Sequence, residues 1–325
     1  MTKTLDIAAI YEPVYADLVR VRSTLKGLSE VQTFPLLNEV LDHMVDLGGK
    51  QVRPAITLLA SRFHPCAPES PILMAAAVEL LHIATLVHDD TIDKATLRRG
   101  RPTVSNTWGK DVAVLAGDYV FAKSATLVCD TNNVRVIRGF AETIMALSSG
   151  ELREYVSTFD AEQTREQYWR RIGDKTASLF ATAAESGAVL SGAPEKHVQA
   201  LREFGRTLGM AFQVFDDLLD FEGDEAVVGK PVGSDIMQGV MTLPTILYRE
   251  QHPQATVTAA FADRENTAKL QQAIAEVRAS SALAESRRIA EDLCNQSRQA
   301  LRDLPDIPAK RSLLALTDYV VQRDR

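Results

Sequence analysis

Two clusters of aspartates have the residue types and spacing needed to bind metal ions. Both follow the pattern Asp-Asp-x-x-Asp, and the second begins 127 residues after the first: Asp89, Asp90, Asp93 and Asp216, Asp217, Asp220. In a helix, the first and last aspartates of each cluster share one face. Carboxylates held this close repel one another, and a divalent cation relieves the repulsion. A site made of hard oxygen ligands is suited to magnesium.

A single cluster of this kind is also typical of a solvated helix end. Each copy here, however, closes an apolar segment, which is Met74–Val87 for the first and Leu208–Phe215 for the second. Aspartates are rarely buried without partners. Two such clusters on core helices favour an arrangement in which they face each other across a cavity. Metal ions between them would bind a diphosphate that neither cluster would tolerate alone.

Two basic segments have the side chains to bind a diphosphate directly. One is Gly48-Gly49-Lys50-Gln51-Val52-Arg53-Pro54, and the other runs from Arg98 to Arg101, just after the first cluster. Lysine and arginine bind phosphate oxygens, and arginine does so with two parallel bonds. Either segment alone is also typical of a solvated loop. Together with the acidic clusters, they predict a site that holds one diphosphate through magnesium and another through protein cations.

Helical periodicity dominates the chain, and strand signals are scarce. The sequence therefore predicts one all-α domain over residues 1–325, with a break at Gly48-Gly49 and others at Asn132-Asn133 and in later Pro- and Gly-rich turns. Helices are expected over these ranges: 36–47, 111–128, 134–156, 175–190, 201–221 and 312–323.

Composition excludes several classes of protein. Of 325 residues, 46% are hydrophobic and 24% charged, which excludes intrinsic disorder, and the net charge of −7 argues against a nucleic-acid partner. The three cysteines are far apart, so neither disulfides nor a zinc knuckle are expected, and the cytoplasm is the expected compartment. No signal peptide or membrane anchor is expected. The apolar stretch Met74–Val87 is interrupted by Glu79 and His82 and is too short to span a bilayer, so we expect a buried core helix.

In these motifs the sequence resembles the trans-type isoprenyl diphosphate synthases (polyprenyl synthetase family). The resemblance covers nearly the whole chain, because the motifs occur in the family's order. They are Gly48-Gly49-Lys50 with Arg53-Pro54, the first aspartate cluster with Arg98-Arg99, Gly117-Asp118-Tyr119, Gly150-Glu151, Lys175-Thr176, Phe212-Gln213 with the second cluster, and Gly229-Lys230 through Asp235 to Thr242-Leu243-Pro244. It implies an isoprenoid synthase-type helical bundle with a central active-site cavity.

The resemblance also implies a role for each matching residue. Magnesium, three ions per site with manganese as a substitute, would be held by Asp89, Asp90, Asp93, Asp216 and Asp220, with Asp217 bonding within the second cluster. Arg98, Lys175 and Lys230 would contact the allylic diphosphate. Isopentenyl diphosphate would be bound by Lys50, Arg53, His82 and Arg99. Thr176 and Gln213 would line the developing carbocation.

The implied reaction is a prenyl transfer. Bound cations stabilise the departing diphosphate, the allylic C–O bond ionises, and the double bond of isopentenyl diphosphate attacks. The proton is then lost to the released diphosphate, since no dedicated base is evident. The family also implies a homodimer, with the apolar segments 111–128 and 134–147 as candidate interface elements, and a product that partitions into membranes.

Three positions depart from the family pattern. Gln51 stands where arginine is common, Glu154 where glutamine is common, and Val240 where lysine is common. The missing lysine removes one expected diphosphate contact.

Chain length is expected to depend on residues one and two helical turns before Asp89. These are Thr85, Ala84 and Leu81, and the small Ala84 and Thr85 leave this level open to a growing chain. We therefore predict an all-trans product longer than farnesyl. A large residue from another helix, such as Phe121, Met145 or Leu147, is an alternative barrier. The exact length, the primer and the pathway stay open.

Three alternatives compete with the synthase. A terpene cyclase of the same fold normally has a different second metal motif. A non-catalytic or regulatory subunit of a heteromeric synthase usually lacks one cluster, although Gln51 and Val240 keep this alternative open. A di-iron bundle needs two Glu-x-x-His pairs, and only Glu79 and His82 have that spacing on the core helices.

Overall fold

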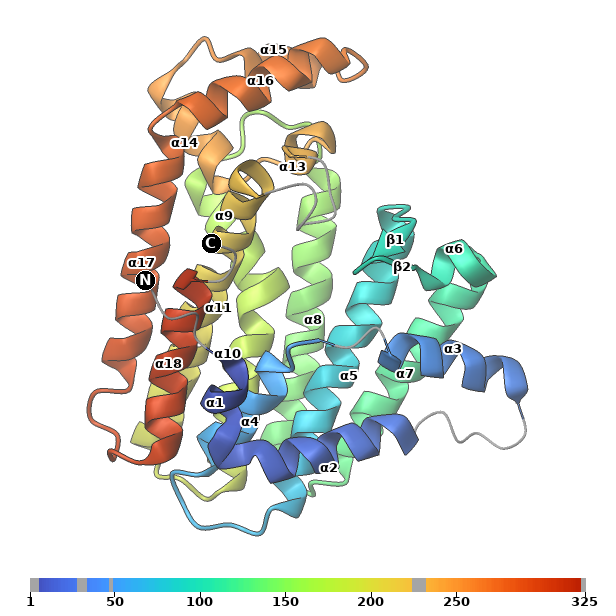
Figure 1. Cartoon of the computed structure of the whole chain (residues 1–325), viewed down its shortest axis with the longest axis vertical. Coiled ribbons are helices and arrows are strands. Elements are labelled where there is room, and N and C mark those ends of the chain that lie inside the picture. The colour runs from blue at the N-terminus through green and yellow to red at the C-terminus, as the bar shows by residue number, and fades with distance from the viewer. Residues whose placement is uncertain (1–5, 28–33, 47–48, 224–231, 323–325) are drawn as a thin grey trace.

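Helices form nearly all the regular structure of the computed structural model, which describes residues 6–27, 34–46, 49–223 and 232–322 (Figure 1). The prediction of an all-α fold is confirmed. The long helices of the bundle are α5 (Glu69–Ile92), α7 (Lys110–Cys129), α8 (Val134–Val156), α10 (Ser178–Leu190), α11 (Glu195–Glu222) and α17 (Ala282–Ala300).

The apolar helix α5 lies inside this bundle. It packs against α7, α4 (Val52–Ser61), α2 (Tyr15–Lys26) and α10. Its residues from Met74 to Leu81 are all buried, so the apolar stretch noted in the sequence is a core helix, as predicted. Burial of a helix on nearly all sides explains why it is apolar around its whole circumference.

The length argument against a membrane span was nevertheless wrong. Helix α5 has 24 residues and α7 has 20, and both are long and apolar enough to cross a bilayer by length and composition. The two helices differ in burial. In the most apolar 18-residue stretch of each helix, 67% of α5 is buried inside the protein but only 39% of α7. Helix α7 therefore presents apolar side chains outward, including Leu115 at 69% exposure.

Most predicted helix boundaries agree with the structure to within a few residues. The helix predicted over 175–190 instead begins as a π-helical turn, η3 (Gly173–Ala177), and continues as α10. The helix predicted from residue 201 starts earlier, at Glu195, directly after Pro194. The last helix, α18 (Pro308–Gln322), begins at a proline, which is favourable at the first helical position.

The remaining elements surround the helices of the bundle. Up to residue 172 they are α1 (Ile7–Tyr11), the 3₁₀ turn η1 (Glu12–Val14), α3 (Pro35–Asp46), α6 (Val104–Trp108) and α9 (Arg165–Ile172). In the C-terminal half they are α13 (Ser234–Met237), α14 (Leu243–Gln251), α15 (Thr256–Ala262) and α16 (Thr267–Ala279), which gather at the top of Figure 1.

One small hairpin follows the first aspartate cluster. Strands β1 (Leu97–Arg98) and β2 (Arg101–Pro102) pair antiparallel, with Arg98 opposite Arg101. The turn residues Arg99 and Gly100 have φ angles of 52° and 75°. Two successive positive φ angles are typical of a tight two-residue hairpin turn, and the glycine meets this requirement at no steric cost.

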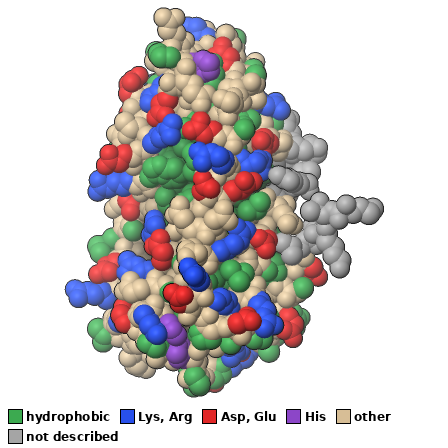
Figure 2. All heavy atoms as spheres, turned by 90° about the vertical axis from the view of Figure 1, so that its left-hand side faces the viewer, with side chains coloured by type: hydrophobic (Ala, Val, Ile, Leu, Met, Phe, Trp, Pro, Cys, Tyr) green, Lys and Arg blue, Asp and Glu red, His purple; other side chains and the backbone are tan. Residues whose placement is uncertain are grey.

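The face formed by α17 and α18 carries charges of both signs (Figure 2). Ion pairs such as Arg288 with Asp292 and Arg298 with Asp318 lie on these helices. Interspersed charge of this kind is typical of solvated surface and does not form a basic patch on this face.

Phe204 tests how α11 is held in the core. Its side chain is fully buried, and its carbonyl oxygen accepts a hydrogen bond of 3.1 Å from Ser297 of α17. We expect Phe204→Ala to lower the free energy of unfolding by about 3–5 kcal/mol through the lost apolar contact and the cavity left behind. Urea titration followed by circular dichroism measures this. Val19→Ala, at a 41% exposed position, is the control, and equal losses in both variants would contradict the expectation.

Candidate active site

The structure brings one carboxylate from each aspartate cluster to the same cavity. This cavity, about 740 Å³ in volume, lies between α5, α8, η3 and α11 and is lined by Asp89 of the first cluster and Asp216 of the second. Lys175 lines it between them, and Arg98 and Arg99 reach it from the hairpin. The six aspartates do not all face this space, because each one has different surroundings.

Asp89 is the most electrostatically crowded carboxylate of the first cluster. Burial, together with Glu151, Asp93 and Glu154, raises the pKa of Asp89 to about 7, against the opposing effect of Lys175. A carboxylate at this position is therefore protonated in part at neutral pH unless more positive charge is nearby. A bound cation would supply that charge.

Asp90 is occupied by an arginine rather than facing the shared cavity. Arg98 Nε lies 2.9 and 2.7 Å from the two carboxylate oxygens of Asp90, and Arg98 Nη2 lies 2.7 Å from Oδ1. Asp90 is buried, so this ion pair satisfies a charge that would otherwise be costly. The pair also fixes the start of the hairpin relative to the end of α5.

Asp217 anchors a buried chain of hydrogen bonds. Tyr168 Oη donates to Asp217 Oδ2 at 2.6 Å, Gln213 Nε2 donates to Asp217 Oδ1 at 3.0 Å, and Thr176 Oγ1 donates to Gln213 Oε1 at 2.6 Å. Burial raises the pKa of Asp217 to about 6, although the bonds from Tyr168 and Gln213 favour its charged form. The chain orients Gln213 and Thr176, the two residues predicted to face the carbocation.

Asp220 ties the end of α11 to α13. Its carboxylate accepts hydrogen bonds from Ser234 Oγ at 2.6 Å and from the backbone N–H of Asp235 at 3.1 Å. Asp93 and Asp217 line a smaller pocket of about 460 Å³ next to the shared cavity, with Lys175 on its border. In the part of the chain that the structure describes, no three acidic, histidine or cysteine side chains form a ready-made metal cage.

Lys175 is placed by a close approach of α8 and η3. A side chain on Gly150 would put its Cβ only 2.6 Å from the backbone nitrogen of Lys175, so glycine is required there. Lys175 Nζ lies 2.5 Å from Glu154 and 2.7 Å from Glu151. Burial opposes the charged form of this lysine, but Glu154, Asp89 and Glu151 outweigh it and raise the pKa of Lys175 above its ordinary value.

A second pocket, of about 640 Å³, collects the predicted basic residues. It is lined by Lys50, Arg53, His82, Arg98 and Arg99. Four of them, Arg53, His82, Arg98 and Arg99, also line the shared cavity, so the two spaces are contiguous. Burial and the nearby arginines lower the pKa of His82 well below its usual range, so this imidazole is neutral at neutral pH.

Several residues of the site escaped the sequence analysis. Glu79 lines the basic pocket, and Arg53 and Arg99 are the charges that oppose the effect of burial on its pKa. Tyr168 and Tyr319 were also missed as site residues; Tyr319 lies under the ammonium group of Lys50, which is 5.2 Å from the ring centroid. Helical spacing is the sequence signal that could have identified two of these residues. Glu79 lies one turn before His82, and Tyr168 lies two turns before Lys175.

The three predicted chain-length residues do not behave alike. Leu81 and Thr85 line the shared cavity, whereas Ala84 is completely buried and is not part of its lining. Phe121 and Leu147 face the same space from α7 and α8. Met145 is 61% exposed instead, which excludes it as a barrier within this subunit. Lys230 lies outside the described residues, so its predicted contact with the allylic diphosphate stays a prediction.

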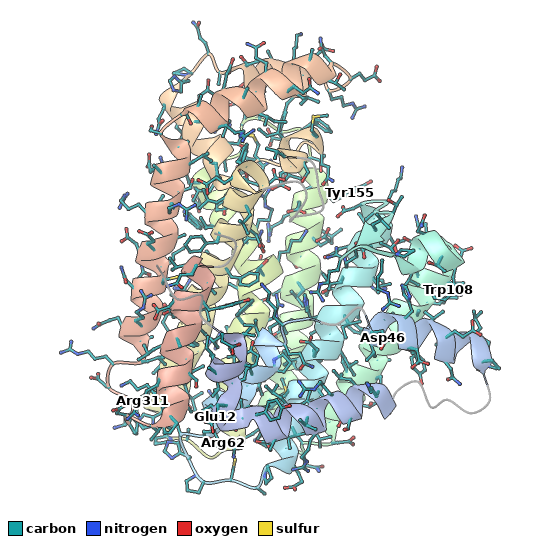
Figure 3. All side chains as sticks on the ribbon, viewed as in Figure 1. Glu12, Asp46, Arg62, Trp108, Tyr155 and Arg311 are labelled. Atoms are coloured by element: carbon teal, nitrogen blue, oxygen red, sulfur yellow. The ribbon has the colours of Figure 1, made fainter. Side chains whose placement is uncertain are left out.

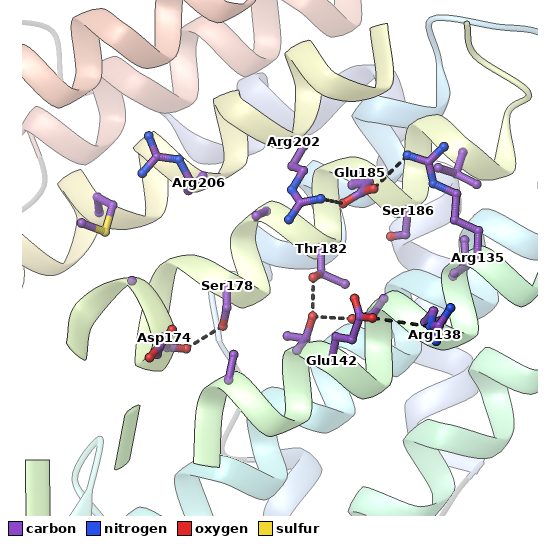
Figure 4. Close-up of a pocket in the computed structure, with 18 of the residues that line it drawn as sticks. Arg135, Arg138, Glu142, Asp174, Ser178, Thr182, Glu185, Ser186, Arg202 and Arg206 are labelled. Atoms are coloured by element: carbon purple, nitrogen blue, oxygen red, sulfur yellow. Dashed lines mark hydrogen bonds and ion pairs between the residues drawn. The ribbon is translucent and has the colours of Figure 1, made fainter. Parts of the chain in front are cut away.

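A larger hollow lies elsewhere among the described residues. A groove of about 1050 Å³ runs between α8, α10 and α11 and contains none of the predicted site residues (Figure 4). Its walls carry ion pairs, with Arg135 and Arg202 both reaching Glu185. Size therefore does not identify the active site here, whereas converging charge does.

The fold and the site together are those of a helical enzyme that acts on diphosphates. Comparison with known proteins identifies the family. The polyprenyl synthetase model matches residues 34–277, and the chain belongs to this family. The predicted relation to trans-isoprenyl diphosphate synthases is thus confirmed.

The sequence similarity to related proteins covers almost the whole chain. Heptaprenyl diphosphate synthase component 2 of Geobacillus stearothermophilus is 36% identical over 98% of this chain and 100% of its own length. Octaprenyl diphosphate synthase of Escherichia coli is 34% identical over 91% of this chain and 92% of its own.

Solved structures of synthases in this family have the same fold as this chain. A decaprenyl diphosphate synthase from Rhodobacter capsulatus has a TM-score of 0.92 at 35% identity, covering 98% of this chain and 100% of its own. A polyprenyl synthase from Caulobacter crescentus, complexed with calcium and isoprenyl diphosphate, has a TM-score of 0.92 at 32% identity, covering both chains completely. These findings favour the synthase over the terpene cyclase. The di-iron alternative is disfavoured by the site itself, since Glu79 and His82 lie among arginines.

Tyr168 tests the chain of bonds around Asp217. Without the phenol hydroxyl, the charged form of Asp217 loses a donor, so Tyr168→Phe is expected to raise the pKa of this carboxyl above about 6. Because protonated Asp217 is a weaker acceptor for Gln213 than the carboxylate, the acidic limb of the pH profile of prenyl transfer should move to higher pH. Profiles at saturating magnesium, compared with those of the unaltered protein, measure the shift. Coincident acidic limbs would show that this bond does not control the site.

Proposed function

We propose that this protein is an all-trans polyprenyl diphosphate synthase, which joins isopentenyl diphosphate to geranyl, farnesyl or geranylgeranyl diphosphate. The observation that carries the proposal is one continuous space in which carboxylates of both aspartate clusters lie next to a set of protein cations. The acidic part contains Asp89 and Asp216, Arg53 and Arg99 lie where the two parts meet, and Lys50 lies in the basic part. Two diphosphates bound in these two ways would lie next to each other.

The acidic part fits divalent cations. Asp89, Asp93 and Asp216 have carboxylates of the kind that magnesium prefers, and the crowding that raises the pKa of Asp89 is what a cation would relieve. We propose that these three residues hold magnesium, three ions per site, with manganese as a substitute. Bound there, the metal supplies positive charge that stabilises the departing allylic diphosphate. A related synthase crystallised with calcium and isoprenyl diphosphate supports a divalent cation.

We propose that Asp90 and Asp220 are positioning residues. Asp90 is bound by Arg98, and Asp220 accepts bonds from the segment at Ser234 and Asp235. Each side chain therefore fixes the ends of the helices that present Asp89 and Asp216. Lys175 would bind the allylic diphosphate on the opposite side.

The protein's own groups shape the reaction. When the allylic C–O bond breaks, the electron pair leaves with the diphosphate, and positive charge develops on the prenyl chain. Thr176 and Gln213, oriented by their mutual bond, present oxygen lone pairs toward that charge. The double bond of isopentenyl diphosphate then forms the new C–C bond, and the released diphosphate takes the proton. The apolar lining at Phe121, Leu147 and Phe212 excludes water from the cation.

The cavity below Asp89 supports a product longer than farnesyl. Thr85 lies one turn below the carboxylate and Leu81 two turns below, and neither is an aromatic residue that would close the space. Phe121 and Leu147 are large side chains that line the same cavity. Relatives named heptaprenyl, octaprenyl and decaprenyl diphosphate synthases agree with a long chain.

A second copy of the chain is the proposed partner. Large apolar side chains are exposed along α7 and α8: Val114, Leu115, Tyr119, Val134, Met145, Leu152, Tyr155 and Val156. Both helices include the segments predicted to form the interface of a homodimer. We also propose a cytoplasmic location, in agreement with three free cysteines, and a product that partitions into membranes.

A product assay distinguishes this proposal from a regulatory subunit. Purified protein is incubated with magnesium, labelled isopentenyl diphosphate and each of the three allylic primers, and the products are sized. A synthase elongates a primer by itself, whereas a regulatory subunit is active only with a second chain. A cyclase would instead consume a long diphosphate without isopentenyl diphosphate.

Carboxylate variants test the acidic part of the site. We expect Asp89→Asn and Asp216→Asn each to lower kcat/KM by about 100-fold or more, because each removes charge that stabilises the transition state. Asp303→Asn, at an exposed position distant from the cavity, is the matched control. Retention of full activity by both cavity variants would exclude the proposed metal sites.

Two substitutions on the neighbouring helices α5 and α7 test product length. Thr85→Phe should shorten the main product, because an aromatic ring would fill the cavity one turn below Asp89, and Phe121→Ala should lengthen it. Ala84→Phe is a poor test, since overpacking the fully buried Ala84 costs about 1–3 kcal/mol of stability. Chain length is read by chromatography of the dephosphorylated products. Unchanged lengths in both informative variants would place the growing chain elsewhere.

A further inference from the structure

The basic pocket is assembled from two segments that are distant in sequence. Lys50 and Arg53 follow α3, whereas Arg98 and Arg99 belong to the hairpin β1–β2. The segments come into contact at Gly49, where a Cβ would lie 3.1 Å from Nη1 of Arg99. The relative position of α3 and the hairpin therefore sets how far apart these cations lie.

The hairpin has little structure of its own to hold that position. Only two residue pairs form its ladder, and a hairpin this small is not stable alone. Its base is tied by Thr103, whose backbone N–H donates to the Thr96 carbonyl at 3.1 Å and whose hydroxyl donates to the Ala95 carbonyl at 2.7 Å. Arg98 adds its ion pair with Asp90 on the α5 side.

His43 of α3 holds the hairpin from the other side. Its Nε2 lies 2.8 Å from the carbonyl oxygen of Pro102, the last residue of β2. A carbonyl oxygen only accepts, so His43 Nε2 carries the proton and donates. The imidazole also packs edge-on against Trp108 of α6, with ring centroids 5.1 Å apart. Figure 3 shows Trp108 beside the end of α3 at Asp46.

The C-terminal end of α3, three residues after His43, precedes the other cation-bearing segment in the chain, and that segment is itself anchored. Tyr11 Oη donates to the backbone carbonyl of Lys50 at 2.8 Å, and Arg22 Nη1 donates to Gln51 Oε1 at 3.0 Å. With the segment after α3 fixed in this way, the bond from His43 to Pro102 joins α3 to the hairpin on which Arg99 lies.

We propose that His43 is a positioning residue for the diphosphate of isopentenyl diphosphate. By bonding the hairpin to α3, it sets the distance between Arg99 and the pair Lys50 and Arg53. Loss of this bond would leave every cation present but misplaced. The inference rests on the proposed function, since it assigns that diphosphate to the basic pocket.

Three variants test this inference. We expect His43→Ala to raise the KM for isopentenyl diphosphate about five- to tenfold, the effect of one lost hydrogen bond, while kcat changes less than about twofold. His43→Gln, whose side-chain amide also donates at this reach, should return KM to within about twofold of the unaltered protein. His64→Ala is the matched control, because His64 bonds His197 at 3.0 Å away from both pockets.

Hydrogen exchange gives a readout that does not depend on activity. Amides of residues 96–103 should exchange faster in His43→Ala and return to the original rate in His43→Gln. If the unaltered protein elongates no primer, the proposed function fails, and exchange still tests the link. If it is active, an unchanged KM in His43→Ala overturns the inference. So does a loss of kcat and thermal stability that His43→Gln does not restore, since that would mark a purely structural role.

Discussion

The confinement of several carboxylates in a buried space is the constraint on which the rest of the structure depends. Burial and mutual repulsion raise the pKa of Asp89 to about 7, and burial raises that of Asp217 to about 6. The protein reduces this repulsion in a different way at each aspartate. Arg98 pairs with Asp90, and Tyr168 donates to Asp217, whereas Asp89 and Asp216 are the members of the two clusters that line the cavity, together with Glu151. A cation that binds there is stabilised by negative charge that the fold has already brought together.

The same division of charge explains two of the three departures from the family pattern. Glu154, in place of the common glutamine, forms an ion pair with Lys175 and lies 3.6 Å from Arg171. Gln51, in place of the common arginine, accepts a bond from Arg22 of α2, so a guanidinium still lies near this position. Val240 borders the small acidic pocket, and nothing in the structure explains the loss of a lysine there.

Helix packing sets the precision of the site. The approach of α8 to η3 is close enough that Gly150 has no room for a side chain, and this approach brings Glu151 and Glu154 to Lys175. The π-helical turn η3 presents Lys175 and Thr176 to the cavity, while Gly173 and Asp174 line the groove behind it. Irregular turns of this type often occur at functional sites, because they change the face on which side chains emerge.

The sequence alone determined the helical architecture, the core position of α5 and the two acidic and two basic segments. These follow from local periodicity and residue type, which act over a few neighbouring positions. Tertiary structure decided which of these side chains face the cavity. Asp90 and Asp220 bind other groups, Ala84 is packed away while Thr85 is not, and Glu79 joins the basic pocket. Such differences arise because adjacent helical residues point about 100° apart, and only the neighbouring helices determine which direction is buried, bonded or open.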